Sequence, residues 1–179
     1  MEVRVLTEND AQDFWSLRLK MLEEEPDSFL ATLEEEINKP LEKVIVRFRE
    51  TWSTNENYII GVFIEGNLMG CAGFEREQRK KLRHKGNVWG MYVIPDLRGQ
   101  GVGRLLLREL IKKSGSLEGL EQLDLAVISD NLPAKSLYLS IGFVTYGVEP
   151  RALKVRDYYM DEDLMVLRII KSSSDLRVH

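Results

Sequence analysis

The sequence has little of several features that would point to particular protein classes. It contains one cysteine, Cys71, and two histidines, so a disulfide within the chain is impossible and a His/Cys metal site is not expected. The net charge of −4 lacks the basic excess typical of nucleic-acid binders. No apolar run is long enough to span a bilayer, and the first residues lack a signal-peptide core. We therefore expect a cytoplasmic protein with no metal, no nucleic-acid partner and no membrane partner.

The length and composition fit one ordinary domain. A chain of 179 residues, 44% of them hydrophobic, can build the core of one domain and is too short for two domains of ordinary size. We expect a domain over residues 1–170, followed by a polar, frayed tail over 171–179.

The spacing of apolar residues predicts a mixed α/β (α+β) domain. A short first strand precedes a helix whose start is marked by a Thr7–Asp10 capping box. The stretch from 75 to 85 is polar and is expected to be an exposed loop. The further elements are a helix at 41–52, strands at 58–64, 68–74 and 88–94, a helix at 101–113, a strand at 123–127, a helix at 132–140, and strands at 143–148 and 164–169. This order is not that of a doubly wound parallel sheet.

The most informative segment is the glycine-rich turn at 98–103, between a strand and a helix. The first turn of a helix has unpaired N–H donors and partial positive charge, and glycines let a ligand approach them closely. The segment therefore predicts a pyrophosphate cradle, to which Arg98 and Arg104 add charge. It is neither a Walker A loop, because no Lys-Ser/Thr follows, nor a dinucleotide fingerprint, because Leu106 stands where a third glycine is needed.

Two longer motifs resemble those of the GCN5-related N-acetyltransferases. The run from Tyr92 to Arg104 is similar to the acetyl-CoA signature of that family, Arg/Gln-x-x-Gly-x-Gly/Ala after a strand. The run from Asn131 to Phe143 resembles its Asn-x-x-Ala-x-x-x-Tyr-x-x-x-Gly-Phe element. The resemblance covers roughly residues 1–170. It implies a mostly antiparallel sheet flanked by helices, with a splayed pair of strands that holds CoA.

The resemblance also implies an activity and a set of site residues. The expected reaction moves an acetyl group from acetyl-CoA, a co-substrate, to a primary amine of a small molecule or protein by direct attack in a ternary complex. Tyr138 is the candidate general acid for the leaving thiolate, and backbone N–H groups of Met91 or Val93 are candidate oxyanion donors. The residues expected to bind the cofactor are Met91, Tyr92, Val93, Arg98, Gly99, Gln100, Gly101, Val102, Gly103, Arg104, Asn131, Ala134, Ser136 and Tyr138.

The sequence departs from many relatives because the strand at 88–94 contains no acid that could serve as general base. Glu75 is the nearest alternative, although a solvated carboxylate is the commoner explanation of such a residue. Tyr158, Tyr159, Asp161 and Glu162 are weaker candidates, and a water molecule stays open as the base.

Several questions stay open at this point. A non-catalytic acyl-CoA sensor is the alternative function, supported by the missing acid. The acceptor pocket is expected to be formed by segments near 25–40, 75–87 and 150–162, whose spacing does not reveal the acceptor. The sequence also leaves open whether the donor is acetyl or a larger acyl group, and whether the chain forms a homodimer.

Overall fold

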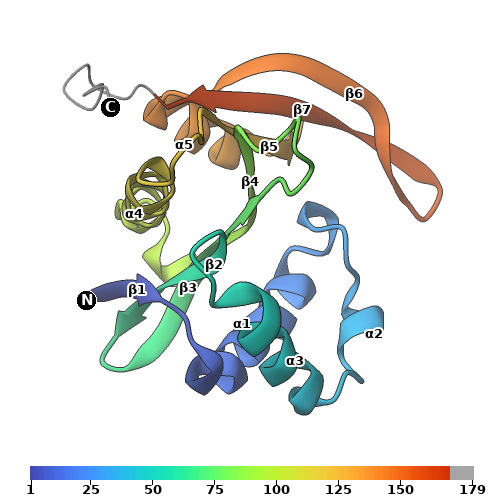
Figure 1. Ribbon diagram of the computed structural model, residues 1–179. Helices are drawn as coiled ribbons and strands as arrows, with labels where there is room; N and C mark the ends of the chain where they lie inside the picture. Colours follow the sequence, from blue (N-terminus) through green and yellow to red (C-terminus); the bar gives the residue numbers. More distant parts are fainter. Residues whose placement is uncertain (170–179) are drawn as a thin grey trace, which may run out of the picture.

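One sheet organises the described part of the chain, residues 1–169 of the computed structural model. Its seven strands lie in the order β1-β2-β3-β4-β5-β7-β6 (Figure 1). Every neighbouring pair is antiparallel except β4 and β5, which run parallel. The predicted fold class, a mixed α/β domain with a mostly antiparallel sheet, is confirmed.

The elements follow one another along the chain as the sequence order predicts, with one extra short helix, α2. They are β1 (Glu2–Val5), α1 (Ala11–Glu24), α2 (Leu33–Glu36), α3 (Leu41–Arg47), β2 (Asn57–Ile64), β3 (Asn67–Arg76), β4 (Lys85–Val93), α4 (Val102–Gly115), β5 (Gln122–Ile128), α5 (Leu132–Ile141), β6 (Val144–Val155) and β7 (Tyr158–Arg168). Short helical turns lie at Glu8–Asp10, Pro26–Ser28, Phe48–Trp52 and Pro95–Leu97.

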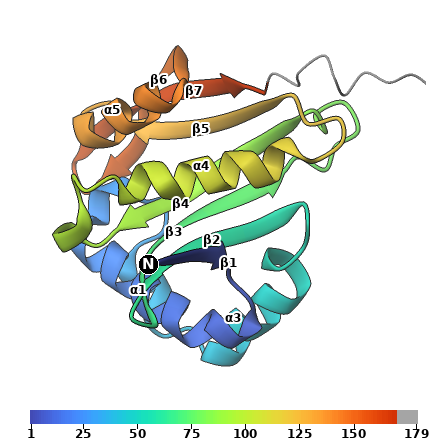
Figure 2. The same ribbon diagram turned by 90° about the vertical axis from the view of Figure 1, so that its left-hand side faces the viewer.

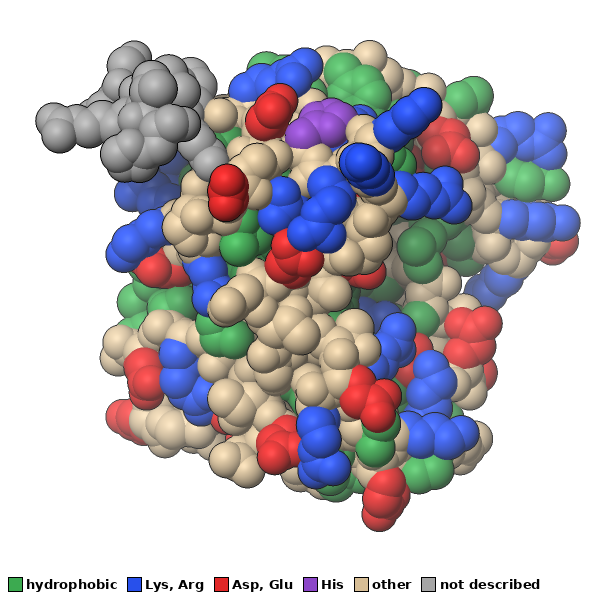
Figure 3. All heavy atoms as spheres, viewed as in Figure 1, with side chains coloured by type: hydrophobic (Ala, Val, Ile, Leu, Met, Phe, Trp, Pro, Cys, Tyr) green, Lys and Arg blue, Asp and Glu red, His purple; other side chains and the backbone are tan. Residues whose placement is uncertain are grey.

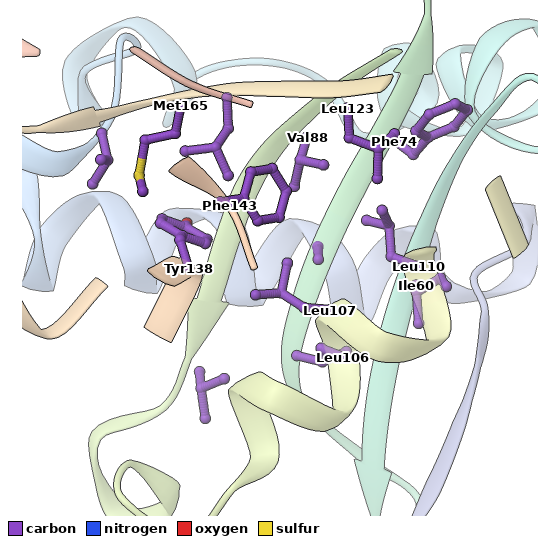
Figure 4. Packing of buried hydrophobic residues seen from close by; sticks show 14 of the residues in the cluster. Ile60, Phe74, Val88, Leu106, Leu107, Leu110, Leu123, Tyr138, Phe143 and Met165 are labelled. Carbon is purple, nitrogen blue, oxygen red and sulfur yellow. The ribbon is translucent and has the colours of Figure 1, made fainter. Parts of the chain in front are cut away.

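Helices cover both faces of the sheet and create two apolar cores. The helix α4 lies across one face, and α1 and α3 lie on the other (Figure 2). On the α4 face, Leu106, Leu107 and Leu110 are fully buried, and they belong to the same core as Tyr138 and Phe143 (Figure 4). The opposite core is built by the apolar faces of α1 and α3, including Phe14, Leu17, Met21, Val44 and Phe48. The alternating strand residues therefore pack on two sides, as a central sheet requires.

The sequence patterns predicted most helix starts correctly, and the differences between predicted and observed element bounds have physical causes. Thr7 and Asp10 form the predicted capping box before α1. The expected helix at 41–52 ends as an α-helix at Arg47 and continues as a π-helical turn, Phe48–Trp52. The last two strands are much longer than predicted, because β6 and β7 pair with each other as far as Val155 and Tyr158. Those added residues are largely solvent-exposed, so no apolar pattern marks them.

The expectation of an exposed loop at 75–85 is wrong for Arg76. This residue belongs to β3 and is only 7% exposed. Its guanidinium donates to the carbonyl oxygens of Arg83 and Glu118, at 2.8 and 2.7 Å, and to Glu56 Oε1 at 3.0 Å. Arg76 thus ties the 77–84 loop to the segment between α4 and β5, and it is not a solvated charge.

A second buried charge fixes the position of α5. Asp163 on β7 accepts from Lys135 Nζ at 2.8 Å, from Ser129 Oγ at 2.6 Å and from Thr145 Oγ1 at 3.3 Å. Lys135 lies on α5, so this network links the helix to β5, β6 and β7. The bond from Lys135, followed by that from Ser129, holds the pKa of Asp163 below its usual value.

The predicted tail at 171–179 lies outside the described residues. No helix within residues 1–169 has the length and apolar character needed to cross a membrane.

We predict that Asp163→Asn lowers the free energy of unfolding by on the order of 2 kcal/mol, because Lys135 loses a charge-assisted bond in a buried setting. The native carboxylate has a lowered pKa, so its contribution is full above the unfolded value of about 4 and is lost as the pH falls below it. The wild-type advantage over the variant should therefore shrink between neutral and acidic pH.

Urea unfolding at a series of pH values measures this effect. Glu109→Gln, which removes a solvent-exposed pair with Lys112, is the control and should change stability by less than about 0.5 kcal/mol. A stability difference between the wild type and Asp163→Asn that does not change with pH would contradict a stabilising role of the ionised Asp163 carboxylate.

Candidate active site

A β-bulge in β4 opens the sheet at its centre. The register pairs Cys71 with Tyr92 and Gly73 with Trp89, so two residues of β4, Gly90 and Met91, stand opposite Ala72 alone. Gly90 has φ +59°, which only glycine adopts readily, and this explains the residue at the bulge. On its other side, β4 pairs with β5 only from Lys85 to Asn87. Beyond that point the two strands separate, as the resemblance led us to expect.

The separation leaves backbone donors of β4 on an open edge. The N–H of Ile94 donates to Met69 on β3, at 3.0 Å. Because successive N–H groups of a regular strand point to opposite edges, that of Val93 faces the β5 side, and the N–H of Met91 lies in the adjoining bulge, where the alternation is interrupted. The carbonyl of Val93 lies on that side too, where it accepts from Arg98 Nε at 2.9 Å. These are the two N–H groups that the sequence analysis proposed as oxyanion donors.

The glycine-rich turn then delivers the start of α4 to this edge. Gly99 and Gly101 have φ of +73° and +82°, and Gly101 is the residue that precedes the first helical residue, Val102. A Cβ on Gly103 would lie 3.0 Å from Leu137 Cδ2 and 3.2 Å from Met91 Cε. The turn therefore needs glycine twice for its backbone angles and once for close packing of α4 against β4 and α5.

One cavity of about 750 Å³ joins these elements. Ten of the predicted cofactor residues line it: Met91, Tyr92, Val93, Arg98, Gly99, Gly101, Gly103, Arg104, Asn131 and Ala134. The other lining residues had no individually predicted role; they are Glu25, Asp27, Ser28, Phe29, Ile128, Asp130, Pro133, Leu137 and Met160. Two of the three segments expected to form the acceptor pocket contribute to it, through residues 25–29 and Met160, and the segment 75–87 does not.

Four predicted residues do not line this cavity. Gln100 donates from its side chain to the carbonyl of Asp96 at 2.7 Å, and Val102 is buried in the core. Ser136 is exposed on α5. Tyr138 is 7% exposed and packs edge-on against Phe143, with ring centroids 5.9 Å apart. Burial raises the pKa of Tyr138 to about 12, so its hydroxyl keeps its proton at neutral pH.

Asn131, one of the residues expected to bind the cofactor, also caps a helix. Its side-chain oxygen accepts from the Ala134 N–H at 3.2 Å, which caps the start of α5. The same residue lines the cavity. The start of α5 therefore faces the ligand space opposite the open edge of β4.

The cavity holds an ion pair that joins α1 to the glycine-rich turn. Arg98 Nη1 lies 2.7 Å from Glu25 Oε1, and both residues line the cavity. The preceding residue, Glu24, accepts a hydrogen bond from the hydroxyl of Tyr92 on β4. Burial, together with this bond, raises the pKa of Tyr92. The end of α1 thus brings two carboxylates to the β4 side of the cavity, which no local pattern in the sequence reveals.

The tip of the β6–β7 hairpin closes the same region from the other side. Tyr158 donates to Asp27 Oδ2 at 3.0 Å, and Met160 lines the cavity. Figure 3 shows a hollow with an apolar floor between this hairpin and the segment that contains α2. Glu75, the proposed base, is exposed on β3 opposite Asn87 and does not line the cavity. Among residues 1–169, no three His, Cys, Asp or Glu side chains gather as a metal site requires.

Comparison with known proteins agrees with this geometry. The model of the acetyltransferase (GNAT) family matches residues 14–143. N-alpha-acetyltransferase RimI of Mycobacterium tuberculosis is 34% identical over 109 residues, which are 60% of this chain, and the chain spans 65% of that protein.

Two solved structures show the same fold. An acetyltransferase of the GNAT family from Streptococcus pneumoniae superposes with a TM-score of 0.86 at 24% identity, covering 94% of this chain and 99% of that one. The protein yncA from Salmonella typhimurium, solved with its cofactor acetyl-CoA, gives a TM-score of 0.82 at 17% identity, covering 97% and 96%. Because the family model matches most of the chain and these structures share its fold, the chain belongs to the acetyltransferase (GNAT) family.

Proposed function

We propose that the protein transfers an acetyl group from acetyl-CoA to a primary amine, by direct attack within a ternary complex. One observation carries this proposal: a single cavity joins the open edge of β4, the glycine-rich turn before α4 and the start of α5. Those three parts match the three parts of the donor, which are an extended arm, a pyrophosphate and a thioester.

The residues of the cavity fit CoA in shape and charge. The free N–H groups at the start of α4, with Arg98 and Arg104, suit a pyrophosphate. The open backbone of Met91 and Val93 suits the amides of the pantetheine arm, which would pair with it as an added strand does. Asn131 and Ala134 would lie on the opposite side of that arm.

Acetyl-CoA supplies an acetyl group activated as a thioester. The amine nitrogen bonds to the acetyl carbon as the carbon–sulfur bond breaks, and the N–H of Met91 or Val93 stabilises the negative charge that develops on the carbonyl oxygen. We assign the proton that the sulfur takes up to Tyr138, which does not line the cavity itself but follows Leu137, which does, so this step requires its hydroxyl to reach the ligand. The proton lost by the amine then restores that hydroxyl through water. We assign no carboxylate as the dedicated base: β4 contains none, and of the acids that line the cavity Glu25 is paired with Arg98 and Asp27 accepts from Tyr158.

A non-catalytic acyl-CoA sensor is the second candidate, favoured by that missing acid. The two functions differ in one measurable outcome. The enzyme consumes the thioester when amines are added, whereas the sensor binds acetyl-CoA and leaves it intact with every amine of a panel.

We predict that Gly101→Ala weakens acetyl-CoA binding about tenfold or more, because a methyl group enters the cradle and displaces a charge-assisted bond. Gly66→Ala in the β2–β3 turn is a matched control, since Gly66 has the same φ of +82° and the same open surroundings. Both variants should lose similar stability in thermal unfolding, and calorimetry should show weaker binding only for Gly101→Ala. Equal affinity in the two variants would place the pyrophosphate elsewhere.

We predict that Tyr138→Phe lowers kcat by roughly a hundredfold, the lower range for general acid catalysis, while the affinity for CoA is unchanged. The phenyl ring preserves the packing against Phe143. The control is Tyr146→Phe, which removes a hydroxyl from an exposed residue of β6. Single-turnover measurements test the effect, and a wild-type rate of the chemical step in Tyr138→Phe would assign the proton to another group.

We predict that Glu25→Gln tightens CoA binding several-fold, because the Glu25 carboxylate competes with the pyrophosphate for Arg98. Two like charges about 4 Å apart repel by about 1–4 kcal/mol near a protein surface. Glu23→Gln, on the exposed side of α1, is the control and should bind as the wild type does. The gain in CoA affinity of Glu25→Gln over the wild type should shrink at high salt, because salt screens the repulsion. Weaker CoA binding in Glu25→Gln would mean that Glu25 supports the cofactor site.

A further inference from the structure

Arg18 is a half-buried cation beside the acceptor side of the cavity. It lies on α1, and its guanidinium carbon is 5.7 Å from the ring centroid of Phe29. Phe29 itself lines the cavity, together with Met91 and Tyr92 on β4. Nη1 of Arg18 contacts Met21 Sδ at 3.9 Å, and a thioether sulfur is only a weak acceptor. The guanidinium therefore lies next to a cavity-lining ring, although Arg18 itself does not line the cavity, and most of its donors are unused.

Arg18 lacks the anionic partner that five other arginines of the described chain have. Arg4, Arg49, Arg76, Arg83 and Arg98 each have a carboxylate oxygen within ion-pair distance. Within residues 1–169, Arg18 has none. Burial lowers the pKa of Arg18, although the group stays protonated at neutral pH. A partly desolvated cation without a counter-ion is unfavourable, so an arriving anion would gain both hydrogen bonds and charge compensation.

The unused donors of Arg18 remain reachable. In the described chain, Trp89 Nε1 is the one side-chain nitrogen or oxygen that is both fully buried and without a hydrogen-bond partner. Nε and Nη2 of Arg18 have no partner and are not in this class, so these two atoms are not fully buried. A guanidinium presents its donors as a planar fork, which matches the two oxygens of a carboxylate.

The charged groups around Arg18 leave the region positive. Glu36, Arg47 and Cys71 are the groups whose charge acts on it. Glu36 is paired with Lys39 at 2.8 Å, and burial raises the pKa of the Cys71 thiol to about 12, so it is neutral. Arg47 adds a second guanidinium, stacked over Trp52 at 4.6 Å. An anion is therefore favoured at this position over a cation.

We propose that Arg18 binds a carboxylate of the acceptor, which makes the preferred substrate a free amino acid. Phe29 would then contact the apolar part of that acceptor, whose amine reaches the thioester at the open edge of β4. This inference rests on the proposed acetyl transfer and names its substrate class.

The test compares amino acids with their carboxamides, which keep the amine and the side chain and lose the negative charge. For the wild type, kcat/KM should favour an amino acid over its carboxamide. In Arg18→Met that preference should fall roughly tenfold to a hundredfold, because a charge-assisted bidentate contact is lost. Activity on the carboxamide should fall far less than activity on the amino acid, because only the amino acid loses a charge-assisted contact.

The matched control is Arg49→Met, which removes an exposed arginine paired with Glu8 on the surface. It should keep the wild-type preference. Arg18→Met should unfold at the wild-type temperature or above it, because an uncompensated cation is removed, so misfolding would not explain a lost preference.

A second measurement does not depend on turnover. N-acetyl amino acids are titrated into the protein–CoA complex by calorimetry, and they should bind the wild type and Arg49→Met but bind Arg18→Met at least about tenfold more weakly. Equal affinity in all three proteins overturns the role of Arg18, as does a wild type that acetylates carboxamides, polyamines or peptides as well as amino acids. If CoA binds and no amine is acetylated, acetyl transfer itself is refuted, and the titration still decides whether Arg18 holds a carboxylate.

Discussion

The separation of β4 from β5 is the constraint on which the rest of the site depends. A sheet normally pairs every backbone group in its interior, and unpaired groups are unfavourable unless a ligand or water satisfies them. Here the bulge at Gly90 and Met91 turns β4 away after only three paired residues, Lys85 to Asn87. The backbone hydrogen bonds that β4 and β5 do not form with each other leave room for an extended ligand to lie along Met91 and Val93. The cavity is thus a part of the sheet left incomplete, into which α4 and α5 direct their first turns.

The helix α1 belongs at once to the core and to the site. Phe14, Leu17 and Met21 are nearly fully buried and attach it to one face of the sheet. The same attachment fixes Arg18 beside Phe29 and, just after the helix ends, Glu25 against Arg98. Packing energy from the buried face therefore positions charges that would otherwise be poorly ordered on a helix surface.

Charge is divided between the two halves of the cavity. Arg98 and Arg104 lie at the turn before α4, where an anionic pyrophosphate is expected, and Glu25 balances Arg98 in the free protein. Arg18 lies beside Phe29 and has no carboxylate within ion-pair distance among the described residues, although the charge of Glu36 acts on it. Asp163 and Arg76, in contrast, are charges whose partners are all within the protein, and their effect is to hold α5 and the 77–84 loop in place. Arg76 and Asp163 hold segments of the fold in place, whereas Arg98 and Arg104 line the cavity and are available to a ligand.

The sequence by itself determined the order of the elements, the fold class, and the glycine turn with its helix, because these depend on neighbouring residues. Left-handed angles at Gly99 and Gly101 and the capping role of Asn131 act over a few positions. Only the tertiary structure decided the partners across the cavity. Glu25 and Arg98 are 73 residues apart and Tyr158 and Asp27 are 131 apart, so no local pattern links them. The burial of Arg76 and the isolation of Arg18 follow from the path of the whole chain, because a side chain's partners depend on which distant segments pack around it.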